Sequence, residues 1–344
     1  MCRLFRQQGS QDHPSQAAAR AWLAAILQSL AVIAALPATA APQAQSVPTA
    51  TARFSAAVEA YRAGRKDSAL ELFTEAAGAG NLDAQWLLGQ ALSDGRLGVT
   101  DAGQARQWLT RAAEAGHVGA QADLGALLLS DKGGKAEPAV AARWLRQAAL
   151  RGDARARYEI GRLTERGEGV EADIDAARRW YQQAAEQGVL EAIHRLGVMN
   201  YEGLGMPRNP AQAASWLRQA AERGHPDAQL RMGALRENGQ GVRADTAMAA
   251  QWYRLAAEQG VAWAQFRLAV LLETGKGVPA DTLEAYRWML LAKRGADPAA
   301  GPWEVDGHLA RLRALLAPAE IAEAQAQADA FKARSPGGET SRAD

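Results

Sequence analysis

The stretch RWYQQAAEQG (Arg179–Gly188) returns 72 residues later as QWYRLAAEQG (Gln251–Gly260), with seven of its ten residues unchanged. The shared tryptophan belongs to a series with a constant step of 36 residues: Trp108, Trp144, Trp180, Trp216, Trp252 and Trp288. In the first five units a pair of alanines and then a glycine follow the tryptophan at fixed distances. A period between 20 and 50 residues predicts an array of stacked repeats and not one irregular domain.

Each unit is expected to contain two helices. In the stretch 173–188, small and aromatic residues recur at positions i, i+3, i+4, i+7 and i+8, which predicts a second helix with one buried face. Asp173 is placed to cap its start, and Gly188 to leave its end in the left-handed conformation. The same capping position holds Asp101, Asn209, Asp245 and Asp281. We expect the alanine pairs and the tryptophans to be buried between neighbouring repeats.

The first helix of a unit is shorter, as in 154–167, where Ala156 and Gly161 allow close packing. Glycine-rich connections join the two helices: GEGVEAD, GQGVRAD and GKGVPAD. No strand precedes them and they lack the spacing of a Walker or G-x-G-x-x-G loop, which argues against phosphate binding. They are interpreted as tight turns, each with one valine tucked beneath it.

The ordered set A-x-x-x-L-G, G-x-G-V-x-x-D and A-x-x-W-Y-x-x-A-A-E-x-G at 36 residues resembles the Sel-1-like repeat, a relative of the tetratricopeptide repeat. The resemblance covers roughly 84–297 and implies an all-α fold, a right-handed α/α solenoid of about seven helix pairs. Residues 53–83 look like an opening unit. The solenoid is expected over 53–300, capping helices over 301–334 and a disordered tail over 335–344. Two departures are DKGGKAEPAV in the second unit and Ala269 in place of glycine.

The first forty residues have the features of a secretory signal peptide. Arg3, Arg6 and Arg20 precede an uncharged run over 21–36, and PATA follows with alanines in A-x-A spacing. The run has 16 residues, short of the roughly 18 to 20 that a spanning helix needs. We therefore expect cleavage after residue 40, a linker over 41–52 and a periplasmic protein; the alternative is a retained anchor. The only cysteine, Cys2, lies in this segment, so the mature chain would have no disulfides.

The composition argues against several function classes. Lys plus Arg number 39 and Asp plus Glu number 38, which gives no overall field for nucleic acid. The five histidines lack metal-ligand spacing, and there is no G-x-S-x-G elbow. Carboxylates recur at repeat positions and are expected to be caps or solvated groups. We expect no catalytic site, no metal and no cofactor, and interpret His117 and His225, which follow the terminal glycines, as surface residues.

The tetratricopeptide resemblance implies that the first helices line a concave face. Three columns would face it. The first is Trp86, Ala122, Tyr158, His194, Leu230 and Phe266. The second is Asp83, Gly119, Arg155, Glu191, Asp227 and Trp263. The third is Ser93, Leu129, Glu165, Tyr201, Glu237 and Glu273. These columns vary between units, as both a binding face and an unconstrained surface do.

Aromatic and arginine side chains favour binding, because they are the usual anchors of interfaces. The candidate partner-binding residues are Trp86, Arg155, Tyr158, Glu165, His194, Tyr201, Trp263 and Phe266. The expected function is a monomeric, non-catalytic scaffold or regulatory adaptor of the periplasm that binds a protein or peptide in the concave groove. The resemblance implies an envelope sensor or a polysaccharide-export component as partner, with membrane contact only through an uncleaved N-terminal segment. The alternatives are a β-lactamase-like hydrolase, whose cysteines and S-x-x-K motif are missing here, and an envelope glycan-binding protein.

Overall fold

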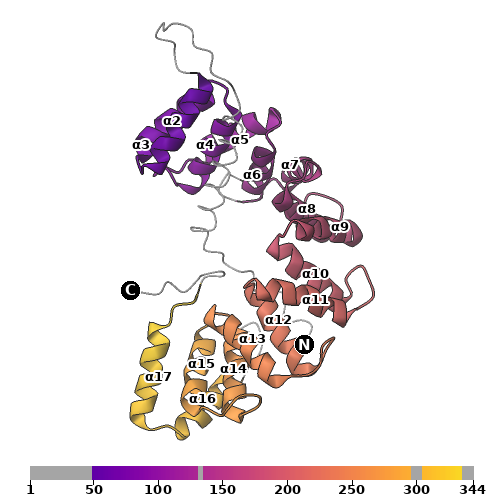
Figure 1. Cartoon of the computed structure of the whole chain (residues 1–344), viewed down its shortest axis with the longest axis vertical. Helices are drawn as coiled ribbons and strands as arrows, with labels where there is room; N and C mark the ends of the chain where they lie inside the picture. The colour runs from indigo at the N-terminus through magenta and orange to yellow at the C-terminus, as the bar shows by residue number, and fades with distance from the viewer. Residues whose placement is uncertain (1–48, 131–134, 296–303, 335–344) are drawn as a thin grey trace, which may run out of the picture. The chain divides into compact units, whose positions relative to one another are not determined.

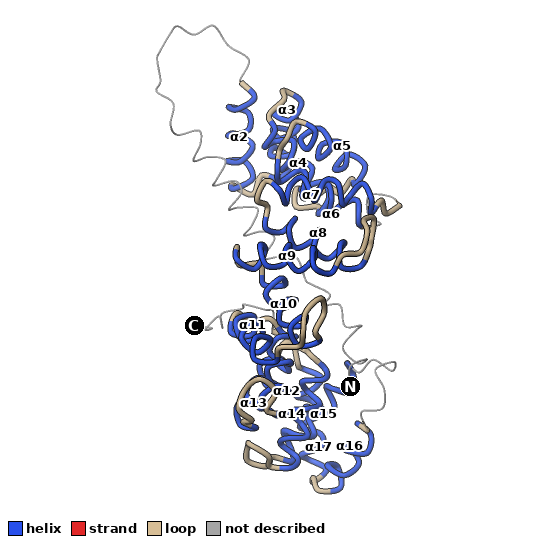
Figure 2. The backbone as a smooth tube through the Cα atoms, turned by 90° about the vertical axis from the view of Figure 1, so that its right-hand side faces the viewer, coloured by secondary structure: helices blue, strands red, loops and turns tan. Residues whose placement is uncertain are grey.

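The computed structural model describes residues 49–130, 135–295 and 304–334, and all regular structure within these ranges is helical (Figures 1 and 2). The chain divides into two compact units between Ala184 and Ala185. We call 49–184 the N-terminal unit and 185–334 the C-terminal unit and describe each by itself. The signal peptide expected at 1–40, most of the linker and the expected tail lie outside the described residues. No described helix has the length and apolar character needed to cross a membrane.

The helices follow one another in pairs. The N-terminal unit contains α2 (Ala50–Arg62), α3 (Lys66–Gly78), α4 (Leu82–Asp94), α5 (Ala102–Glu114), α6 (Val118–Leu129), α7 (Pro138–Leu150), α8 (Ala154–Arg166) and most of α9 (Ile174–Glu186). The C-terminal unit contains α10 (Leu190–Glu202), α11 (Pro210–Glu222), α12 (Pro226–Asn238), α13 (Thr246–Glu258), α14 (Ala262–Thr274), α15 (Thr282–Gly295), α16 (Val305–Ala314) and α17 (Pro318–Ala330). Seven pairs thus run from α2 to α15 in the described part of the chain. They confirm the predicted all-α array.

The predicted caps of the second helices are confirmed. The Asp101 carboxylate accepts a hydrogen bond from the N–H of Gln104 at 2.9 Å, at the start of α5. Equivalent bonds are accepted by Asp173, Asn209, Asp245 and Asp281 at the starts of α9, α11, α13 and α15. The repeat over 118–153, whose sequence departs from the common pattern, has Glu137 at this position. Glu137 forms no side-chain capping bond, and Pro138 is the first residue of α7. Since proline has no N–H, it leaves one fewer donor there to satisfy.

The glycine shared by five of the first helices, α4 to α12, explains how the two helices of a pair approach one another. A Cβ placed on Gly161 in α8 would lie 2.9 Å from the ring of Tyr181 in α9. Gly125 stands in the same relation to Leu145, and Gly233 to Tyr253. The residue immediately after the tryptophan is therefore the one that enters the space left by the glycine. This contact fixes the spacing within a helix pair.

The predicted burial of the tryptophan column is wrong for most of its members. Of the six, only Trp288 is buried, with 2% of its surface exposed, and the other five are partly exposed. Tyr181 and Tyr253 next to them are 1% exposed. The alanine pairs are buried as expected. In every pair the residue after the tryptophan is buried, and the helix turns by about 100° per residue, so five of the tryptophans lie at the edge of the buried face and not at its centre.

The glycine-rich connections pack against the preceding repeat. Gly169 has φ 72°, and a Cβ there would lie 2.3 Å from the backbone carbon of Pro138 at the start of α7. In the C-terminal unit, Gly241 and Gly277 lie equally close to the starts of α11 and α13. Val170 and Val278 are partly buried beneath their turns, as predicted. These glycines serve close backbone contact between repeats.

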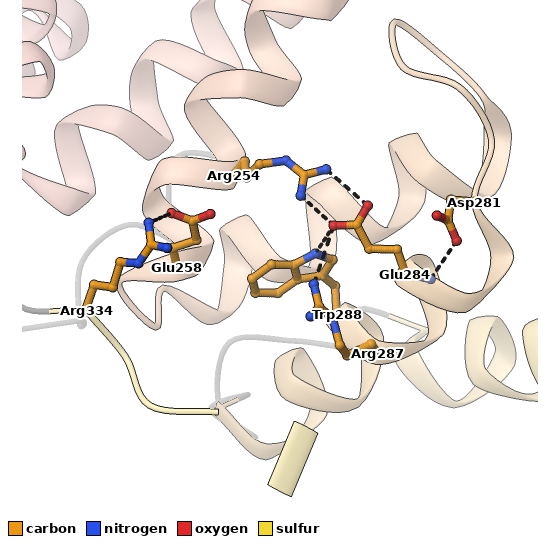
Figure 3. A network of polar contacts seen from close by, with 7 residues as sticks. All are labelled: Arg254, Glu258, Asp281, Glu284, Arg287, Trp288 and Arg334. Carbon is orange, nitrogen blue, oxygen red and sulfur yellow. Dashed lines mark hydrogen bonds and ion pairs between the residues drawn. The ribbon is translucent and has the colours of Figure 1, made fainter. Parts of the chain in front are cut away.

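The chain turns back on itself after α17. Phe331 lies edge-on to Trp288, with ring centroids 5.9 Å apart. The backbone N–H of Arg334 donates to the carbonyl of Glu258 at 2.8 Å, and its guanidinium pairs with the Glu258 carboxylate (Figure 3). Beside this contact, Glu284 of α15 accepts hydrogen bonds from Arg254 and from the indole N–H of Trp288 (Figure 3). The segment 331–334 therefore covers the end of α13 and packs on Trp288 in the middle of α15.

Candidate functional site

The candidate binding residues lie on first helices, and the structure groups them within each unit. In the N-terminal unit they belong to α4 and α8, with α6 between these helices. In the C-terminal unit they belong to α10 and α14, with α12 between these. Within a unit, several of these side chains contact one another or share a partner. We therefore describe two groups of contacts.

In the N-terminal unit, Asp123 of α6 is the centre of a polar cluster that sequence reasoning missed. Its Oδ2 accepts hydrogen bonds from the indole N–H of Trp86 and from the side-chain amide of Gln90, both at 2.6 Å. Its Oδ1 lies 3.5 Å from the guanidinium of Arg155 in α8. Two candidate residues, Trp86 and Arg155, thus converge on one carboxylate. We call Trp86, Gln90, Asp123 and Arg155 the Asp123 cluster.

His117 supports this cluster from the edge. Its ring lies 4.7 Å from that of Trp86, and its Nε2 is 3.2 Å from the carboxylate of Asp83. Its Nδ1 accepts the N–H of Ala120 and so caps α6. His225 caps α12 in the same way. Both histidines are partly buried capping residues and not plain surface residues. The available signal was their position, which Asn81 and Asp153 occupy in other repeats.

Two further candidates, Tyr158 and Glu165, surround the buried Tyr181. The Tyr158 and Tyr181 rings lie 5.7 Å apart, and the Tyr181 hydroxyl donates to Glu165 at 2.7 Å. Burial raises the pKa of Tyr181 well above its usual value. The C-terminal unit repeats the arrangement, with the Tyr253 hydroxyl donating to Glu237 at 2.8 Å. These carboxylates therefore satisfy a buried hydroxyl, and any partner contact by Glu165 would compete with that bond.

In the C-terminal unit, His194 of α10 stacks on His225 with ring centroids 4.2 Å apart and an interplanar angle of 26°. Its Nε2 is shielded from solvent and has no hydrogen-bond partner among the described residues. Burial lowers the pKa of His194 well below 6.5, and the charges of His225 and Arg231 act in the same direction. Burial also raises the pKa of the neighbouring Asp227. The stack holds α10 against the start of α12 with a neutral His194.

The remaining candidates differ in exposure. Tyr201 is partly exposed, donates to Gln240 at 2.8 Å and lies under the guanidinium of Arg208. Trp263 stacks on Phe266 at 5.1 Å, and Phe266 meets His308 edge-on at 5.6 Å. Phe266 is only 7% exposed and packs in the core around α14. Phe266 is therefore a core residue, and its contribution to partner binding stays a prediction.

The first predicted column is less open than expected. Ala122 and Leu230 are 7% and 5% exposed, like Phe266, whereas Trp86, Tyr158 and His194 are partly exposed. In the N-terminal unit the first helices contact one another, α4 with α6 and α6 with α8. Residues at such contacts lose their surface to the next helix. The column thus contains three core positions and three partly exposed positions. Partner binding by its members stays a prediction.

No group of three or more potential metal-ligating side chains gathers among the described residues. Burial raises the pKa of Asp153, although its carboxylate accepts the N–H of Ala156 and caps α8. The acidic groups with shifted pKa values are thus caps or partners of buried residues. These groups stabilise helix starts and buried side chains. The expectations of no catalytic site and no cofactor stay predictions.

The Sel1 repeat family matches six successive segments of the chain: 82–117, 118–153, 154–189, 190–225, 226–261 and 264–297. The chain is similar to several solved structures, including the following two. One is c5321, a protective antigen of uropathogenic Escherichia coli strains with an SLR fold, at 26% identity and a TM-score of 0.71 over 90% of this chain and 64% of that one. The other is a Sel1 repeat protein from Oxalobacter formigenes, at 29% identity and a TM-score of 0.63 over 74% of this chain and 100% of that one. No curated protein matches the chain.

Proposed function

This chain belongs to the Sel1 repeat family, and on that premise we propose that it is a non-catalytic scaffold whose first helices bind another protein or a peptide. Sel1 repeats commonly form scaffolds for protein–protein interaction. The proposal extends this general role to a defined face of the chain. It also assigns the scaffold to the bacterial periplasm, on the basis of the N-terminal sequence.

The Asp123 cluster carries the proposal. Trp86 is partly exposed while its indole N–H is held by Asp123, so the ring is fixed before any partner arrives. Arg155 is exposed beside it, with 68% of its side chain accessible. Aromatic and arginine side chains fixed by their neighbours are typical anchors of interfaces, because little entropy is lost when they bind. Trp86 packs against the alanine and leucine core of the repeats, whereas Arg155 is exposed.

Cross-linking from envelope extract tests the proposal when combined with matched variants. The unchanged full-length protein is cross-linked chemically in the extract, and the captured molecule is identified and titrated. Trp86→Ala should weaken its binding by about 2 kcal/mol, roughly thirtyfold. Trp252→Ala, a partly exposed tryptophan on a second helix, should leave binding nearly unchanged. Equal losses in the two variants, or capture of polysaccharide alone, would contradict the proposal.

The periplasmic location has its own test. N-terminal analysis and intact mass of the protein from an envelope fraction should show that residues 1–40 have been removed. An uncleaved chain that retains Cys2 in the membrane fraction would instead favour the anchor. This result is independent of the binding test, because it depends only on the N-terminal segment.

A further inference from the structure

A second surface of the N-terminal unit differs from the one just proposed. It lies on the second helices α5, α7 and α9 (Figure 1). The helices α5 and α7 are joined at both ends, since Arg106 pairs with Glu137 and Arg151 donates to the carbonyl of Gly116. The helices α7 and α9 together line a pocket of about 590 Å³, with Arg146 and Trp180 among its walls. This surface therefore continues from one helix to the next.

The surface combines exposed arginines with partly exposed tryptophans. We call it the Arg–Trp strip, and its members are Trp108, Arg111, Arg143, Trp144, Arg146, Arg179 and Trp180. All four arginines are exposed, and none forms an ion pair with a described carboxylate. The helix α7 has no acidic residue along its length. In contrast, Arg106 and Arg178 on the same helices are paired, with Glu137 and Asp175.

The C-terminal unit provides an internal comparison. On its second helices, Arg218 lies 3.9 Å from Glu222, and Arg254 and Arg287 both reach Glu284. The same kind of helix face is thus neutralised within the C-terminal unit and left cationic in the N-terminal unit. Both units belong to one repeat array, so packing alone does not require the uncompensated charges. A partner with carboxylates would neutralise them.

The tryptophans of the strip narrow the choice of partner. The guanidinium of Arg111 lies over the ring of Trp108, 4.7 Å from its centroid, so this ring face is covered by a cation. Trp108 and Trp144 also pack against the core. A sugar needs an open ring face to stack upon, and a lipid bilayer needs a contiguous apolar patch. In the described part of this unit, the exposed large apolar side chains are only Val99 and Leu150.

We propose that the Arg–Trp strip binds an acidic segment of a partner polypeptide. Carboxylates of the segment pair with Arg143 and Arg179, because guanidinium and carboxylate match in geometry. An apolar side chain of the segment fits the pocket beside Trp180. Asp173 and Glu171 also line that pocket, so carboxylates bind at the outer arginines and not inside it. The strip is separate from the Asp123 cluster, and neither proposal depends on the other.

A fluorescein-labelled peptide of sixteen alternating glutamate and leucine or serine residues is the probe, titrated with the full-length protein by fluorescence anisotropy. The variant with Arg143→Ala, Arg146→Ala and Arg179→Ala should bind at least tenfold more weakly. Binding by the unchanged protein should weaken as salt is raised, because exposed charges are screened. The matched control removes three exposed arginines of the C-terminal unit: Arg218→Ala, Arg243→Ala and Arg313→Ala. It should stay within twofold of the unchanged protein.

Three outcomes overturn the proposal. One is an equal loss in the control, which would indicate nonspecific charge attraction. Another is undiminished binding of the peptide with glutamine in place of glutamate. The third is a strip-dependent interaction with polyuronate chains or phosphatidylglycerol vesicles but not with the peptide. A second variant, with Arg143→Lys, Arg146→Lys and Arg179→Lys, keeps the charge but not the paired N–H geometry, so it should bind more tightly than the alanine variant and more weakly than the unchanged protein. It guards against a folding defect in the alanine variant.

Discussion

At the scale of single residues, the contact that recurs is between a first-helix glycine and the residue after the tryptophan. In the fourth helix pair, Gly161 receives Tyr181, which is 1% exposed, whereas Trp180 is partly exposed. Tyr181→Ala should therefore lower the free energy of unfolding by about 3 to 5 kcal/mol, as large buried truncations do. Trp180→Ala should cost clearly less. Urea denaturation followed by circular dichroism measures both.

Tyr181→Phe serves as the control for this pair. It keeps the ring against Gly161 and removes only the hydrogen bond to Glu165. Its expected cost is about 1.5 to 3 kcal/mol, the net value of a hydrogen bond to a charged group. A larger loss for Trp180→Ala than for Tyr181→Ala would show that the tryptophan carries the packing after all.

The sequence predicted the repeat frame well because identical residues recur at one spacing. It did not distinguish Trp180 from Tyr181, since both lie on the same apolar stripe and the helix rotation that selects one depends on its neighbours. It also missed the capping role of His117 and His225. Histidine is not among the usual capping residues, because it accepts a backbone N–H only through an unprotonated ring nitrogen. The Asp123 cluster was missed because its members come from three helices.

The His194–His225 stack leads to a pH dependence. Burial holds the pKa of His194 below 6.5, with His225 and Arg231 acting in the same direction. Between its folded pKa and the unfolded value near 6.5, the unfolded chain binds one more proton at this site than the folded chain. The stability that this residue contributes is thus present above about pH 6.5 and is lost as pH falls, by up to about 1.4 kcal/mol per pH unit.

Urea midpoints at pH 7.5 and 5.5 measure this loss. His194→Phe should flatten the difference, since phenylalanine can stack on His225 without a titratable group. Asp227 acts in the opposite direction, because its raised pKa gives the folded state the extra proton above pH 3.8. Asp227→Asn should therefore steepen any loss at the acid end. An unchanged pH profile in His194→Phe would rule out His194 as the responsible group.

At the scale of elements, an added methyl group on a glycine of the connections can destabilise the fold in two ways: by straining a left-handed backbone and by overlapping a neighbouring helix. Gly98 has φ 85° and an added Cβ would meet nothing within 4 Å, whereas Gly169 has φ 72° and abuts Pro138. Gly98→Ala should cost about 1 to 2 kcal/mol, from the left-handed backbone alone. Gly169→Ala should cost about 1 to 3 kcal/mol more, because the methyl group overlaps the start of α7. Thermal denaturation of the two variants measures the difference. Equal costs would show that the connection yields without disturbing α7.

The helices themselves were predictable, and the exposure of their faces was less so. Caps such as Asp173 and terminal glycines such as Gly188 mark helix ends by local chemistry, which the sequence carries directly. The exposure of Ala122 or Phe266 depends on how closely consecutive first helices pack. The distance between consecutive first helices depends on all the side chains between them. It could not be predicted from the resemblance to the tetratricopeptide repeat.

At the scale of the whole molecule, contacts run mainly between consecutive helices. Stability in such an array is close to a sum of local terms, so an end that loses its cover should open without the rest. The C-terminal unit has an identifiable cover, since Phe331 packs on Trp288 and Arg334 binds Glu258 (Figure 3). These contacts connect 331–334 to α13 and α15. Arg294 adds a hydrogen bond from α15 to the carbonyl of Ala328 at 2.8 Å.

Removing this cover should therefore have a local effect. In the variant with Phe331→Ala and Arg334→Ala, hydrogen exchange should accelerate in α13, α15 and α17 and stay unchanged from α2 to α7. The reason is that α15 loses an aromatic contact and α13 an ion pair, while the N-terminal unit loses nothing. Lys332→Ala, an exposed neighbour in the same segment, is the matched control and should leave exchange unchanged throughout. Uniform acceleration over both units would mean that the chain unfolds as one cooperative body, and the nearest-neighbour description would then not hold.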